Sequence, residues 1–146
     1  MSEDRVVDHF WLDLVMHHPS CDPVSITEAL GLFPRAKLNA GQTIGTITQK
    51  STFWMSRYRS GIDSEEFGQA LEDFLAFLEA HSDYLRTFIS EGGDIQLSID
   101  QNVAWDDGII MKLKLEPYFI QELGTYPVGL TVQAWSAEEQ SLLKTN

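Results

Sequence analysis

The longest helical pattern in the chain runs from Ser64 to Ser90. Its large apolar residues recur at steps of three and four, which puts them on one stripe of a helix: Phe67, Leu71, Phe74, Leu75, Leu78, Leu85, Phe88 and Ile89. A stripe this rich in phenylalanine and leucine has to be covered, and a β-sheet is the expected cover. We expect the helix to break near His81 and Ser82, because serine and aspartate favour helix caps over helix interiors.

Segments that read as strands flank this helix on both sides. Alternation of apolar and polar residues predicts five of them, at residues 6–17, 51–59, 94–100, 109–115 and 126–135. The third and fourth are expected to pair as a hairpin through a turn around residues 105–108. Inward positions are clear in four strands, for example Phe10, Leu12, Leu14 and Met16 in the first and Ile95, Leu97 and Ile99 in the third. The alternation in residues 51–59 does not decide which side is inward.

Two shorter helices are predicted between the strands. Ser25 and Glu28 form a capping box at the start of the first, and Asp22 followed by Pro23 is an alternative start. The second covers residues 116–124, with Pro117 in its first turn and Gly124 at its end.

This order of elements predicts an α+β fold, with a mostly antiparallel sheet of about five strands, helices packed on one face, and a ferredoxin-like relationship. A chain of 146 residues suits a single domain with one core. We expect that core to span residues 6–135, and residues 136–146 to form a polar C-terminal tail.

Charge and cysteine content restrict the partners and the compartment. The chain has 22 acidic and 10 basic residues, a formal net charge of −12, which disfavours nucleic-acid binding and favours a basic protein partner. Cys21 is the only cysteine, so an internal disulfide is impossible, and a cytoplasmic location is expected. Neither a signal peptide nor a membrane-spanning segment is predicted.

Residues that could bind a metal ion or act in catalysis lie mostly near the end of the first strand. His9, His17, His18, Cys21 and Asp22 are close in sequence, but their spacing fits no standard zinc pattern. Cys21 and a nearby histidine lack a third orienting group and an oxyanion-hole motif. We therefore expect no metal, no cofactor and no enzymatic activity.

The order of these landmarks resembles an uncharacterised bacterial family known as domain of unknown function 4279. The resemblance covers roughly residues 6–135 and lies in FWLDLVM, DPVSITEALGLFP, the Gly41 loop, the strand carrying Trp54, FGQALEDFLAFLE, DIQLSID and GIIMKLKL. It implies the same α+β architecture. It brings no activity, cofactor or catalytic residue to this sequence.

The best candidate for a binding site is a surface. If the helices cover one face of the sheet, the outward strand residues collect on the other face, among them Trp11, Lys112, Lys114, Gln133 and Trp135. Tryptophans amid lysines and amides are typical of a recognition surface. Alternatively, the loop of residues 35–50, the C-terminal tail or a second copy of the chain could cover this face, because large exposed apolar patches are uncommon on monomers.

The first functional hypothesis is a small, cytosolic, non-enzymatic protein-binding module, immunity- or antitoxin-like, that blocks a basic partner through this face. The alternative is a small-molecule sensor or carrier with a pocket between the sheet and residues 35–50. An enzyme is the third hypothesis, without an acid-base or nucleophile-base pair to support it.

Overall fold

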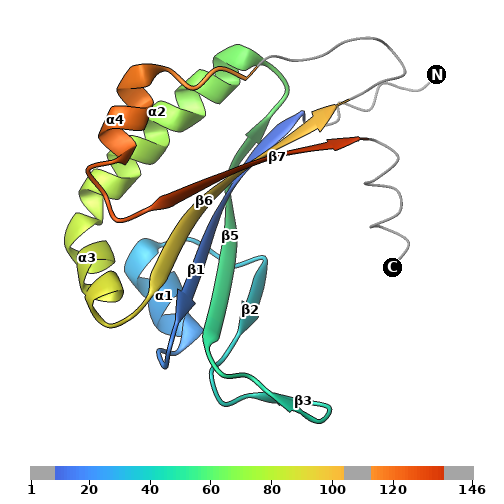
Figure 1. The fold of residues 1–146 in the computed structure, drawn as a ribbon, viewed down its shortest axis with the longest axis vertical. Helices are drawn as coiled ribbons and strands as arrows, with labels where there is room; N and C mark the ends of the chain where they lie inside the picture. The colour runs from blue at the N-terminus through green and yellow to red at the C-terminus, as the bar shows by residue number, and fades with distance from the viewer. Residues whose placement is uncertain (1–8, 104–112, 137–146) are drawn as a thin grey trace.

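The computed structural model describes residues 9–103 and 113–136. Its strands are β1 (Phe10–His18), β2 (Ala36–Leu38), β3 (Thr43–Ile44), β4 (Ile47–Thr48), β5 (Thr52–Gly61), β6 (Asp94–Val103) and β7 (Gly129–Ser136). Its helices are α1 (Pro23–Leu30), α2 (Ser64–Ala80), α3 (Ser82–Ser90) and α4 (Pro117–Leu123). The α+β class is confirmed (Figure 1).

Five strands form one sheet in the order β2-β5-β1-β6-β7, and β3 and β4 form a separate hairpin. The central strand β1 is antiparallel to β5 and to β6, whereas β6 and β7 are parallel. The sheet is therefore mixed, and the prediction of a mostly antiparallel sheet is wrong. The reason is that α4 lies between β6 and β7 in the chain, and a helical connection returns the next strand in the same direction.

The predicted hairpin of residues 94–100 with 109–115 is also wrong. β6 has β1 on one side and β7 on the other, so the backbone groups of residues 96–101 are taken by those two strands. Residues 113–115 form no strand, and residues 104–112 lie outside the described part of the chain.

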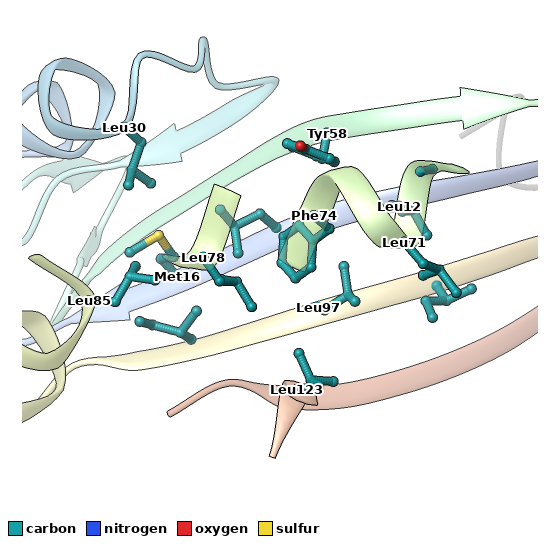
Figure 2. Close-up of a cluster of buried hydrophobic side chains, with 14 of the residues drawn as sticks. Leu12, Met16, Leu30, Tyr58, Leu71, Phe74, Leu78, Leu85, Leu97 and Leu123 are labelled. Atoms are coloured by element: carbon teal, nitrogen blue, oxygen red, sulfur yellow. The ribbon is translucent and has the colours of Figure 1, made fainter. Parts of the chain in front are cut away.

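Helices α1 to α4 lie on one face of the sheet, and within residues 9–103 and 113–136 no helix lies on the other face (Figure 1). Figure 2 shows side chains from α1, α2, α3 and α4 meeting those of β1, β5 and β6. The predicted inward residues of the first and third strands are confirmed: Phe10, Leu12, Leu14, Met16, Ile95, Leu97 and Ile99 are all buried. No helix in the described residues is long and apolar enough to cross a membrane.

The helix ends follow local sequence signals, with one correction. Asp22 caps α1, accepting from the Val24 N–H at 2.9 Å, so the alternative start was right and the Ser25 box was not. Gly31 ends α1 with φ of 69°, a left-handed conformation that glycine adopts without strain. Asp63 caps α2 by accepting from the Glu66 N–H, one residue before Ser64, where the helical pattern of the sequence begins. The predicted break at His81 is confirmed.

The inward side of β5 is mixed in polarity. Thr52, Trp54, Ser56 and Tyr58 are buried in the core. The polar groups find partners there: the Trp54 indole donates to Thr27 Oγ1 at 3.1 Å, and Ser56 Oγ donates to the Phe33 carbonyl at 2.7 Å. Because each buried polar atom is satisfied, this side costs little to bury despite its polar residues.

Candidate binding face

The register of the sheet aligns predicted site residues on the face opposite helices α1–α4. Trp11 of β1 lies opposite Asp100 of β6, and Asp100 lies opposite Gln133 of β7. Trp135 follows two residues after Gln133, on the same face and beside Asn102. We call Trp11, Asp13, Arg57, Asp100 and Trp135, which share this face, the two-tryptophan face.

Trp135 is held by a buried carboxylate. Its indole Nε1–H donates to Asp100 Oδ1 at 2.8 Å, and Ser98 Oγ donates to Asp100 Oδ2 at 3.1 Å. Asp100 is only 5% exposed, although it lies on the face opposite helices α1–α4. A hydrogen bond to an ionised acceptor is stronger than one between neutral groups, so Asp100 fixes the orientation of the half-buried indole.

Trp11 is held in a similar way, through an arginine. The Arg57 guanidinium carbon lies 5.2 Å from the centre of the Trp11 ring, within range of a cation–π contact. Arg57 Nε in turn donates to Asp13 Oδ1 at 3.0 Å, and Asp13 is 6% exposed. Each tryptophan of the face is therefore positioned, directly or through Arg57, by its own buried carboxylate.

One acceptor beside Trp135 has no partner. Within the part of the chain that the structure describes, the side-chain oxygen of Asn102 is buried without a hydrogen bond. Asn102 lies two residues after Asp100 on β6 and directly opposite Trp135. An unpaired buried acceptor favours a hydrogen-bond donor brought by a ligand, since it would satisfy a group that is now costly.

The predicted lysines do not join this face in the described residues. Lys112 lies outside them. Lys114 is not in a strand; its Nζ lies 3.5 Å from Glu116 Oε1, and it lines a cleft with residues of α2 and α4 on the helical side. The expectation that Lys114 belongs to the open sheet face is therefore wrong, because the strand that was to carry it does not form at residues 113–115.

The helical side carries two adjoining hollows of about 340 and 430 Å³ between α2 and α4. Glu72, Leu75 and Tyr118 line both hollows, which makes them one groove along α2. This is not the place predicted for a small-molecule pocket, which was between the sheet and residues 35–50.

The histidines and the cysteine near the end of β1 are engaged locally. His18 Nδ1 accepts from the backbone N–H groups of Ser20 and Cys21 at 3.1 and 2.9 Å. The ring proton is therefore on Nε2, which donates to Glu91 Oε1 at 2.9 Å. His17 is exposed and contacts the Phe53 ring. In residues 9–103 and 113–136, no three His, Cys, Asp or Glu side chains are grouped to hold a metal ion.

The surroundings of Cys21 disfavour its thiolate. Burial, and to a lesser degree the nearby Glu91 and Asp22 charges, raise the pKa of its thiol above the ordinary value. A raised pKa lowers the fraction of thiolate at neutral pH, and the thiolate is the reactive form. His18 is no base for it, because both ring nitrogens already have partners.

No family model, curated protein or solved structure matches this chain. The register confirms that Trp11, Gln133 and Trp135 share one face of the sheet, as predicted, whereas Asp100 between them was not among the predicted site residues. The available signal was the row of polar residues that alternates with the apolar ones along β6: Gln96, Ser98, Asp100 and Asn102.

Proposed function

We propose that this protein is a small cytosolic, non-enzymatic module that binds a basic protein partner through the two-tryptophan face, in the manner of an immunity or antitoxin protein. The observation that carries the proposal is that both tryptophans, on the sheet face opposite helices α1–α4, are held by buried carboxylates, Asp13 through Arg57 and Asp100 directly.

Fixed aromatic side chains are favourable contact residues. Tryptophan supplies a large apolar area, and contact residues that dominate binding energy are enriched in it. A side chain that is already ordered in the free protein loses little rotamer freedom on binding. The hydrogen bond on Trp135 and the stacking on Trp11 reduce that cost before any partner arrives.

Charge supports a basic partner. The chain carries a net charge of −12, so attraction would speed its encounter with a positively charged surface. Beside Trp135, the unpaired Asn102 oxygen and the Asp100 carboxylate suit a donor such as a guanidinium or an ammonium group.

We also propose that the fold is related to ferredoxin-like folds. β5 and β6 are parallel strands joined through α2 and α3, with the antiparallel β1 between them. Such a split β-α-β unit is a feature of ferredoxin-like folds, and it supports the proposed relationship. We further propose that the chain is related to the family known as domain of unknown function 4279, which its sequence landmarks resemble.

The direct test is capture from a lysate of the source organism with tagged protein as bait. The wild type is compared with a Trp11→Ala/Trp135→Ala variant, and Phe33→Ala is the matched control because Phe33 is 85% exposed in the loop before β2. We expect a basic protein to be captured by the wild type and the control but not by the double variant. Equal capture by all three would rule out this face as the docking surface.

A homodimer and a small-molecule-binding function are each tested by a separate measurement. Light scattering that shows only a dimer, abolished in the double variant, would assign the face to a second copy of the chain. A small-molecule sensor or carrier remains the alternative function, favoured by the groove volume, which lies in the range of ligand sites. A metabolite that raises the melting temperature would support that alternative.

A further inference from the structure

The groove between α2 and α4 has an apolar floor and acidic walls. Leu71, Leu75 and Phe119 line its deep side, and Tyr118, which is 64% exposed, stands at its edge. The two hollows that compose it are adjacent along α2. An elongated, open groove of this kind suits a chain segment better than a compact small molecule.

The walls determine the charge of an occupant. Glu65, Glu72 and Glu79 follow one another at seven-residue steps on α2, so they lie along one side of the helix over about 21 Å. Glu116 and Glu122 line the facing wall. Among the described lining residues Lys114 is the only cation, and it is paired with Glu116. This wall pattern complements a segment with basic residues spaced along a helix.

Gly68 leaves the surface of α2 free of a side chain within the groove. It lies inside α2, where glycine weakens a helix relative to alanine. Its φ is not in the left-handed region, and a Cβ placed on it would meet no atom within 4 Å. Nothing in the described fold therefore requires a glycine here. Because Gly68 lines the groove, the missing side chain leaves this stretch of α2 open to an approaching chain segment.

We propose that the groove between α2 and α4 binds a basic amphipathic helix of the partner protein, with its apolar side on Leu75 and Tyr118 and its lysines or arginines against Glu65, Glu72 and Glu79. Helices commonly dock their apolar side into such a groove. This inference rests on the proposed protein-binding function and adds a second contact surface, on the helical side of the sheet.

The probe is a synthetic peptide of leucine and lysine with helical periodicity, about 14 residues long to match the three glutamates. Its binding to the full chain is measured by calorimetry, next to a peptide in which glutamate replaces lysine. We expect only the lysine peptide to bind, more weakly as salt is added. Glu72→Lys should weaken peptide affinity about tenfold. Glu28→Lys makes the same charge change at an exposed position of α1 and should leave the affinity within about twofold of the wild-type value.

Gly68→Leu separates a binding role from a structural one. Leucine favours the helix, so we expect a melting temperature equal to or above that of the wild type. Its side chain fills the groove, so peptide affinity should fall by about tenfold or more. Absence of peptide binding, or equal weakening by Glu72→Lys and Glu28→Lys, would refute the proposal that the groove binds a basic helix. Neither result affects the two-tryptophan face, which is judged by Trp11→Ala/Trp135→Ala capture.

Discussion

Removal of the Asp100 carboxylate tests whether it orders Trp135. Asp100→Ala deletes two hydrogen bonds to an ionised acceptor, from Trp135 Nε1 and Ser98 Oγ. Such bonds contribute about 1.5–3 kcal/mol each. Trp135 and Ser98 are only half-buried, so both donors can regain water, and the gain from no longer burying a charge also offsets the loss.

We therefore expect Asp100→Ala to lower the free energy of unfolding by about 2 kcal/mol, and the melting temperature by about 4–8 °C for a chain of this size. Asp100→Asn keeps the shape and one oxygen acceptor, so its cost should be about 1 kcal/mol. Urea unfolding provides the free energies. The indole N–H resonance of Trp135, assigned with Trp135→Phe, should move in both variants because its acceptor has changed.

A double-mutant cycle of Asp100→Ala with Trp135→Phe isolates the pair. We expect a coupling energy of about 1 kcal/mol or more. Asp100→Ala combined with Tyr84→Phe is the control, because Tyr84 lies on α3 beside Cys21 and Glu91, far along the sheet from Asp100, and its effects should add. Coupling to Trp135 no larger than that of the control would refute the idea that Asp100 fixes the indole.

Three further outcomes follow from the core and from the titrating groups. Phe74→Ala should cost about 3–5 kcal/mol by denaturant unfolding, because the Phe74 side chain is fully buried against Tyr58, whereas Phe33→Ala should cost less than about 0.5. The thiol of Cys21 should react with a disulfide reagent more slowly in the native protein than in urea at the same mildly alkaline pH, because burial raises its pKa; equal rates would contradict this. Burial, with smaller contributions from Cys21 and Glu91, raises the pKa of Tyr84 to about 12, so its phenolate absorbance should develop at a higher pH than that of a free tyrosine. The stability contributed by Tyr84 should be complete below pH 10 and lost between pH 10 and about 12.

Segments with a regular apolar period were predictable. The inward residues of β1 and β6 and the break between α2 and α3 followed from alternation and from cap-forming residues. The facing of β5 did not follow, because Thr52 and Ser56 are buried through acceptors at Cys21 and Phe33, which are distant in sequence. A pattern of polarity along one strand carries no information about such partners.

Strand pairing and site composition were less accessible. Whether β6 pairs with residues 109–115 or with β7 depends on the return path through α4, which alternation does not reveal. Trp11, Gln133 and Trp135 were identified because outward aromatics and amides stand out in a strand. Asp100 reads as an ordinary outward polar residue in the sequence, and its burial depends on the register of β1 and β7 on either side.

The central position of β1 has a consequence for biosynthesis. Its two neighbours are β5 and β6, and Phe10 pairs with Gln101, roughly 90 residues later in the chain. At typical ribosomal rates of about 5–20 residues per second, β1 waits several seconds before its second partner strand is made. During that time its apolar side and its unpaired backbone groups are accessible to chaperones and to other nascent chains. The sheet can close only after most of the chain has left the ribosome.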